Sequence, residues 1–261
     1  MIKTLSAVAV AALTMVGAAQ ANIITVVDLF NTPQADVVDI TADAVAVSSE
    51  MGPVAISQVL GGYRELIINQ TVHNRANSTS SIGVNSGFLN MSNSAGAAST
   101  GIIRWDGFSA VTGGAINTTG LGGIYFGNAL TDSFELSVDF ADGVYFFQID
   151  AYTSATRWST VKIEANQHLF PITSLIPLAA FLDCTNSVPP GPPLVTVTCG
   201  SGGAVDFSNL GALQATIDVD GIATNLDLSL NQVTVVPEPN AIALVGLALL
   251  GAGVASRRRK V

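Results

Sequence analysis

The sequence predicts an all-β fold, a β-sandwich or jelly roll, in the middle of a chain that has a short apolar segment at each end. Three observations support this prediction. Apolar and polar residues alternate along several segments, as they do in half-buried strands. Turn-forming residues recur about every ten positions. The 25 glycines and the charged fraction of only 11% are unusual for long surface helices.

The clearest strand signals are FELSVDF at 134–140 and NLDLSLN at 225–231, in which every second residue is apolar. Asp142-Gly143 follows the first of them and precedes VYFFQID at 144–150, so we expect 134–150 to form a β-hairpin. The other predicted strands are 23–29, 36–47, 65–69, 81–91, 101–105, 159–165, 194–199 and 213–219. No amphipathic helix is predicted between residues 22 and 235.

The middle of the chain is expected to form one domain, residues 22–235. With 261 residues, of which 49% are hydrophobic, the chain can bury a substantial core. Composition gives no clear boundary inside this range. The segment 69–101, rich in Asn, Ser and Gly, is expected to be its least ordered part.

The charge distribution excludes a nucleic-acid partner. The net charge is −9, and residues 22–235 contain 18 acidic but only five basic residues. Binding to nucleic acid requires clustered Lys and Arg to neutralise phosphates.

The N-terminal residues 1–21 have the pattern of a secretory signal peptide. Lys3 precedes an apolar stretch at 5–16, and small residues stand at Ala19 and Ala21. We therefore expect signal peptidase to cleave before Asn22 and the middle of the chain to leave the cytoplasm.

The C-terminal residues 236–261 contain three parts in a fixed order. Pro237, Glu238 and Pro239 come first, and two prolines are expected to keep this segment extended and outside any sheet. The apolar segment 241–255 follows as a single predicted hydrophobic helix of roughly 22 Å, marginal for spanning a bilayer. The last part is a basic cluster that favours a cytoplasmic C-terminus: Arg257, Arg258, Arg259 and Lys260.

This tail resembles the PEP-CTERM sorting signal of exported proteins in Gram-negative bacteria. The resemblance implies that Pro237, Glu238 and Pro239 are recognised by an exosortase, a membrane-embedded processing enzyme. It implies a transient anchor in the inner membrane, followed by delivery to the cell surface or the extracellular space. More loosely, 60–66, 104–107 and 205–218 resemble sandwich domains attached to other such proteins, which implies fold and not activity.

Cys184 and Cys199 are the only cysteines and flank a proline-rich segment. In an exported protein such a pair predicts a disulfide, which we expect to fix a hairpin and to contribute about 3 kcal/mol. Two cysteines without neighbouring histidines do not make a four-ligand zinc site, so no metal is predicted there.

Catalytic motifs are missing from the sequence. His73 and His168 have no HExxH, HxH or HxxxH partner, and no GxSxG, GxGxxG or GxxxxGK[ST] occurs. Asp218-Val219-Asp220-Gly221 fits part of a calcium loop, but a tight turn is the simpler interpretation. Six aromatic residues are candidates for stacking on sugars, although strand aromatics more commonly pack in a core: Trp105, Trp158, Tyr63, Tyr125, Tyr145 and Tyr152.

These observations predict an exported envelope or extracellular-matrix protein that is structural or binds polysaccharide, is not an enzyme and needs no cofactor. One alternative is a secreted carbohydrate-active hydrolase that uses a carboxylate pair, whose two groups would lie roughly 5 to 9.5 Å apart. Another is a calcium-dependent adhesion module.

Overall fold

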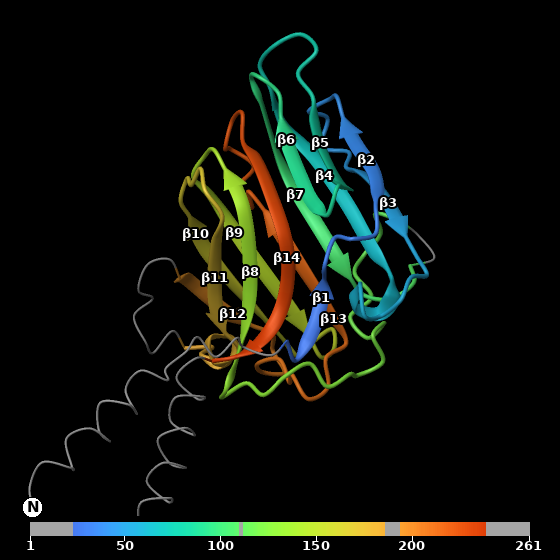
Figure 1. Cartoon of the computed structure of the whole chain (residues 1–261), viewed down its shortest axis with the longest axis vertical. Coiled ribbons are helices and arrows are strands. Elements are labelled where there is room, and N and C mark those ends of the chain that lie inside the picture. The colour runs from blue at the N-terminus through green and yellow to red at the C-terminus, as the bar shows by residue number, and fades with distance from the viewer. Residues whose placement is uncertain (1–22, 110–111, 186–193, 239–261) are drawn as a thin grey trace, which may run out of the picture. The chain divides into compact units, whose positions relative to one another are not determined.

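The computed structural model describes residues 23–109, 112–185 and 194–238, and it confirms the all-β prediction. Two seven-stranded sheets form the layers of a sandwich (Figure 1). Sheet A contains, in spatial order, β11 (Ile172–Pro177), β8 (Asp132–Ala141), β14 (Asp227–Pro237), β6 (Phe88–Asn93), β5 (Ser80–Asn85) and β2 (Gln34–Asp39), with β1 (Thr25–Asp28) also paired to β14. Sheet B contains β12 (Leu194–Cys199), β10 (Trp158–Ala165), β9 (Tyr145–Tyr152), β13 (Ala212–Ile217), β7 (Ala97–Trp105), β4 (Arg64–His73) and β3 (Val47–Met51).

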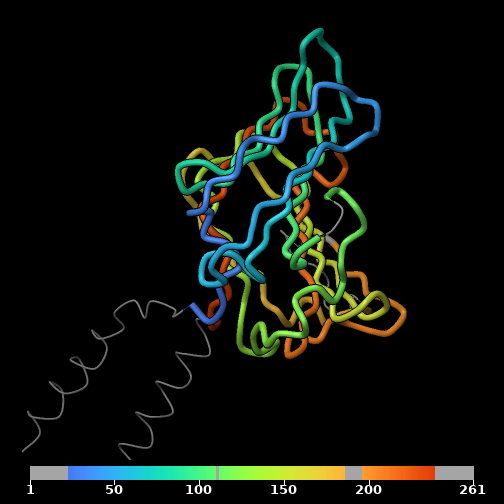
Figure 2. The backbone as a smooth tube through the Cα atoms, turned by 90° about the vertical axis from the view of Figure 1, so that its right-hand side faces the viewer, coloured from blue at the N-terminus to red at the C-terminus, as the bar shows by residue number. Residues whose placement is uncertain are grey.

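Figure 2 follows the backbone through the strands of the two sheets. The core lies between these sheets, and buried apolar residues of both contribute to it. Phe134, Leu136 and Val138 of β8 are buried, and so are Phe147 and Ile149 of β9. A side chain at Gly101 of β7 would come within 2.7 Å of the Met91 sulfur on β6 in the opposite sheet. Glycine at that position therefore allows the two layers to approach closely.

The predicted hairpin at 134–150 is wrong, although both of its strands exist. β8 pairs with β11 and lies in sheet A, whereas β9 pairs with β10 and β13 in sheet B. The connection at 142–144 therefore crosses from one layer to the other, and Gly143 does not have the positive φ that the predicted turn requires. The alternation of apolar and polar residues does not distinguish a hairpin from two strands in opposite sheets, because every second residue is buried in both arrangements.

Two other strand predictions are also corrected. The segment 36–47 is not one strand: β2 ends at Asp39 in sheet A, and β3 begins at Val47 in sheet B. The predicted strand 81–91 is two strands, β5 and β6, joined by a tight turn in which Ser86 and Gly87 both have positive φ. The segment 69–101, expected to be the least ordered part, contains both of these strands and parts of β4 and β7.

The edge strand β11 was not predicted. Its residues Ile172–Pro177 do not alternate cleanly, and most of them are exposed. Besides the strands, the described residues contain two short 3₁₀ helices, η1 (Leu60–Gly62) and η2 (Leu178–Leu182).

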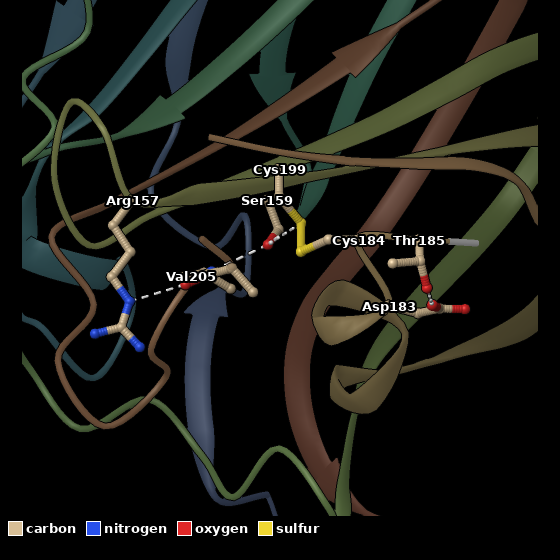
Figure 3. The surroundings of a disulfide bond; sticks show 8 residues. Arg157, Ser159, Asp183, Cys184, Thr185, Cys199 and Val205 are labelled. Carbon is tan, nitrogen blue, oxygen red and sulfur yellow. Dashed lines mark hydrogen bonds between the residues drawn. A yellow bond between two sulfur atoms is a disulfide. The ribbon is translucent and has the colours of Figure 1, made fainter. Parts of the chain in front are cut away.

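The predicted disulfide between Cys184 and Cys199 is confirmed, with the two Cα atoms 5.5 Å apart (Figure 3). It does not fix a hairpin as expected. Cys184 follows η2, which comes after β11 of sheet A, and Cys199 ends β12 of sheet B, so the bond closes a crossover between the layers. Ser159 Oγ lies 3.5 Å from the Cys199 sulfur and accepts a hydrogen bond from Val205 N, which ties the crossover to β10.

A fully buried ion pair joins β4 to β1. Arg64 Nη1 donates to both carboxylate oxygens of Asp28, at 2.9 and 3.0 Å, and both side chains are 0% exposed. Arg64 also donates from Nε to Gln34 and from Nη2 to the Thr32 carbonyl. Trp105 Nε1 donates to Asp28 Oδ2 at 3.0 Å. The sequence shows these residues only as isolated polar positions beside apolar ones.

Residues Ile23–Val236 form one compact unit. The predicted signal peptide 1–21, with Ala19, Ala21 and the cleavage position Asn22, lies outside the described residues, as does the predicted hydrophobic helix 241–255. Within the described part of the chain, no helix is long and apolar enough to cross a membrane.

Candidate functional site

A continuous row of polar side chains crosses the outer face of sheet B, on six neighbouring strands. Its members are direct cross-strand partners, so each faces the next at the same level of the sheet. Tyr145, Phe147 and Ile149 of β9 point into the core, which places the alternating Asp150 on the opposite face. The polar row consists of Glu50, Glu65, Arg104, Gln214, Asp150 and Thr160.

Arg104 holds the middle of the polar row together. Its Nη1 lies 3.1 Å from Glu65 Oε2, and its Nε donates to Gln214 Oε1 at 2.7 Å. The same guanidinium donates to the Gly114 carbonyl at 2.7 Å. The three contacts engage the guanidinium in one fixed orientation, so its charge is compensated within the row.

Asp150 is a buried carboxylate that accepts hydrogen bonds from neutral groups. Thr160 Oγ1 donates to Oδ1 at 2.5 Å, Gln148 Nε2 lies 2.9 Å from Oδ1 and 3.1 Å from Oδ2, and Gln214 Nε2 donates to Oδ2 at 3.1 Å. Burial raises the pKa of Asp150, and these three hydrogen bonds act against that rise. A carboxylate has about four acceptor positions, so these contacts satisfy it within the sheet.

The loop after β7 is anchored on the acidic end of the polar row. Ser109 N donates to Glu50 Oε2 at 2.9 Å, and Gly113 N donates to Glu65. Asn117 N donates to Asp106 Oδ2 at 2.7 Å. Burial raises the pKa of Glu50, and repulsion from Glu65 and Asp106 adds to the rise. The carboxylate oxygens of Glu50, Glu65 and Asp106 accept these three hydrogen bonds and so hold the loop against the sheet.

Two aromatic side chains lie beside the other end of the polar row. Tyr152 and Trp158 are cross-strand partners, each two residues from a member of the row and hence on the same face of the sheet. Their ring centroids are 6.4 Å apart, and both side chains are half-buried. Burial, with the nearby Asp150 charge, raises the pKa of Tyr152 to about 12, so its hydroxyl stays neutral at physiological pH.

The six aromatic candidates are therefore divided. Trp105 and Tyr145 are buried in the core and cannot stack on a ligand. Tyr63 packs against Phe108 with centroids 5.6 Å apart. Tyr125 is 60% exposed and is not a member of the row; the neighbouring Ile124 pairs with Leu210. Tyr152 and Trp158 are the pair that the sheet brings together with polar partners.

The remaining predicted positions are not members of the polar row. His73 ends β4, and His168 lies after β10, where its backbone pairs with that of Ala141. The segment 218–221 is a tight turn, as expected: Gly221 N donates to the Asp218 carbonyl, and Asp220 pairs with Lys162 at 2.8 Å.

The final strand continues into the predicted sorting signal. β14 runs to Pro237, which corrects the expectation that the prolines keep this segment out of a sheet. Proline can end a strand because its carbonyl still accepts, and its missing N–H matters only where a ladder continues. Val235 of β14 accepts a hydrogen bond from Ile24 N at 2.8 Å. Pro239 and the basic residues at 257–260 lie outside the described residues.

Residues 235–260 match the family model of the PEP-CTERM protein-sorting motif. The chain carries a PEP-CTERM sorting signal. This signal implies that the PEP-CTERM protein is exported, anchored transiently in the membrane through its tail, processed by an exosortase and delivered to the cell surface. A search of curated proteins found no match to the chain.

Sequence reasoning missed every member of the polar row. Each of them occupies a polar position in a strand of alternating apolar and polar residues. Many other polar strand residues occupy such positions, so the pattern does not identify a site. What makes them a group is the strand order β3-β4-β7-β13-β9-β10, and that order joins segments up to 110 residues apart, as in the contact of Arg104 with Gln214.

Proposed function

We propose that this PEP-CTERM protein acts outside the cell, in the envelope or extracellular matrix, as a non-catalytic protein that binds a neutral polysaccharide. The binding surface is the half-buried end of the polar row, Gln214 and Thr160, together with Tyr152 and Trp158. Glu65 and Asp150 are buried and hold this end of the row in place. The proposal includes removal of residues 1–21 by signal peptidase before the domain folds outside the cytoplasm. It includes no cofactor.

The observation that carries the proposal is the polar row beside an aromatic pair. Sugars present hydroxyl groups at their edges and C–H groups on their faces. Carboxylate and amide side chains at fixed cross-strand spacing pair with the hydroxyls, and aromatic rings cover the apolar faces. Gln214 and Thr160 are the half-buried polar members of the row next to the aromatic pair, on β13 and β10.

Charge supports a neutral polymer rather than an acidic one. Arg104 is paired with Glu65, and Lys162 is paired with Asp220 and lies over the Phe146 ring at 4.2 Å. The remaining charges of the row are carboxylates, so the surface repels uronic acids and sulfated sugars.

The binding test uses alanine substitutions of the two aromatic residues, Tyr152 and Trp158. Affinity for hydroxyethyl cellulose and for dextran is measured by calorimetry, with alginate as the acidic comparison. Tyr152→Ala and Trp158→Ala are expected to weaken binding to a neutral polymer by about tenfold each. Tyr125→Ala is the matched control and should bind as the parent does. Equal binding by all four proteins, or binding to none of the neutral polymers, would remove the basis of the proposal.

The two alternatives have their own measurements on the same samples. A hydrolase with a carboxylate pair would release reducing ends from the polymer, whereas the proposal predicts none above the buffer control. Calcium-dependent adhesion would make a chelator lower both the affinity and the melting temperature, whereas the proposal predicts no change in either.

A further inference from the structure

The start of β1 and the end of β14 lie side by side at one end of the sandwich (Figure 1). Thr25 pairs with Val235, and Ile24 N donates to the Val235 carbonyl at 2.8 Å. β14 ends two residues later, at Pro237. The domain therefore begins and ends at the same end of the sandwich.

The segment 124–131, which leads into β8, lies against the same end. Thr25 Oγ1 donates to the Phe126 carbonyl at 2.8 Å. A Cβ added at Gly127 would lie 3.2 Å from Val235 Cγ1. The segment is thus in contact with both β1 and the last residues of β14.

Four large apolar side chains are exposed at this end, two before β1 and two in the segment that leads into β8. We call them the apolar end patch: Ile23, Ile24, Tyr125 and Leu130. Leu130 is 76% exposed, and Tyr125 is 60% exposed. Neighbouring exposed apolar side chains indicate an interaction site, and tyrosine is enriched where a protein meets the bilayer interface.

The sorting signal brings a bilayer within reach of the apolar end patch. The signal anchors the protein transiently through its tail, and the apolar segment 241–255 begins four residues after Pro237. Four residues span at most about 14 Å when fully extended. β14 has 11 residues and is roughly 35 Å long, so its other end is much farther along the chain from the anchor.

The anchor also makes a small contact area sufficient. A second contact made by a molecule that is already attached is intramolecular, so it profits from a high effective concentration of lipid. Four exposed side chains would be a weak membrane site in a free domain. In the anchored chain they need only to select one orientation of the domain.

Charge indicates that the contact is apolar and not electrostatic. None of the four side chains of the apolar end patch is charged, and residues 22–235 contain 18 acidic but only five basic residues. Attraction to anionic lipid head groups requires clustered Lys and Arg. Burial of apolar surface in the interfacial layer of a zwitterionic bilayer requires none.

We propose that the apolar end patch inserts into the interfacial layer of a zwitterionic lipid bilayer while the tail anchors the protein. The contact orients the domain with the end of β14 towards the membrane and keeps the sorting motif at the membrane surface until it is processed. It is separate from the polysaccharide surface, because none of its residues belongs to the polar row or to the aromatic pair.

The experiment uses the chain from Asn22 to Val261 in nanodiscs of phosphatidylcholine and phosphatidylethanolamine, with and without a nitroxide-labelled lipid that quenches fluorescence. An apolar fluorophore is attached to Leu130→Cys. Both native cysteines form the disulfide, so the new thiol is the only free one. Ile222→Cys is the matched control, because Ile222 is 69% exposed and precedes the start of β14, at its other end. We expect the nitroxide lipid to quench the label at position 130 and to leave the label at position 222 bright.

A second set of variants separates the contact from the reach of the tail. Ile24→Asp together with Tyr125→Asp leaves the tail intact but places two charges in the apolar end patch. Burying one apolar side chain is worth about a factor of ten or more, so this change should abolish most of the quenching at position 130. Phe170→Asp together with Ile222→Asp, at exposed positions beyond the other end of the strands, should leave the quenching unchanged.

Thermal unfolding checks that each variant is folded. Equal quenching at positions 130 and 222 would overturn the proposal and would leave a membrane protein as the partner of the apolar end patch. Quenching at position 130 that persists in the folded variant with Ile24→Asp and Tyr125→Asp would overturn it as well, because the short tail alone would then explain the proximity.

Discussion

Removing the charge of Arg64 should destabilise the protein far more than removing any exposed charge. The Arg64 and Asp28 side chains are both 0% exposed, and Arg64 Nη1 donates to both carboxylate oxygens. Arg64→Met leaves the Asp28 carboxylate buried with hydrogen bonds from Trp105 and from the Phe30 N–H, but without a counter-ion. Leaving one member of a buried pair uncompensated costs about 3 to 5 kcal/mol.

In a protein of this size, 1 kcal/mol shifts the melting temperature by about 2 to 4 °C, so Arg64→Met should lower it by roughly 10 °C. Asp28→Asn should be destabilising as well. The double variant removes both charges. We expect its loss of unfolding free energy to be smaller than the sum of the two single losses by about 1 to 3 kcal/mol. The assay is chemical unfolding of the four proteins at one pH.

The exposed Arg75→Met variant is the control, and its effect should stay within about 0.5 kcal/mol. The reasoning would be refuted if Arg64→Met cost no more than Arg75→Met. Strict additivity of the single effects would refute it too, because it would mean that the two buried groups do not interact.

Three further predictions concern the polar row, its loop and the disulfide. Burial raises the pKa of Asp150 in the folded protein. At a pH above the pKa of this group in the unfolded chain, the folded state therefore binds more protons than the unfolded state, and stability falls as the pH rises. Asp150→Asn removes this penalty, and its stability relative to the parent should increase as the pH rises above the unfolded-state pKa of the carboxyl group. A difference independent of pH would contradict the assignment. Gly120→Ala should cost about 2 kcal/mol or more, measured by unfolding, because the new Cβ would overlap the Asp106 carbonyl oxygen. Replacing Cys184 and Cys199 together by alanine should cost about 3 kcal/mol for a sequence separation of 15 residues, and an unchanged melting temperature would show that the crossover does not need the bond.

The sequence predicted the fold class correctly because alternation and turn chemistry are local. Phe134, Leu136 and Val138 had to share one face of a strand whatever that strand paired with. The partner was not predictable, because β8 and β9 bury the same pattern in a hairpin or across two layers. Asp142-Gly143 pointed to a hairpin, but Asp142 instead accepts a hydrogen bond from Asp227 N at the start of β14, a contact 85 residues away.

The candidate site shows the same limit. The tail was recognised because its parts are consecutive, and Cys184 and Cys199 were paired because there was no other choice. The polar row required the register of six strands, and the apolar end patch required the pairing of β1 with β14. Nothing local distinguishes Glu65 or Gln214 from other polar strand residues.

The end of β14 affects how the sorting signal should be removed in an experiment. Val235 and Val236 are buried, so a deletion beginning at residue 236 would damage the domain as well as the signal. Ending the chain after Glu238 removes the tail and leaves the described strand complete.

The most direct test of the account is the intact mass of the protein recovered from the envelope and medium of cells that contain an exosortase. The account predicts a chain that begins at Asn22 and ends near Pro239, and it predicts that the protein shortened after Glu238 is not processed at its C-terminus. A recovered chain that still contained Arg257–Val261 would contradict it, because the tail would then be a permanent anchor.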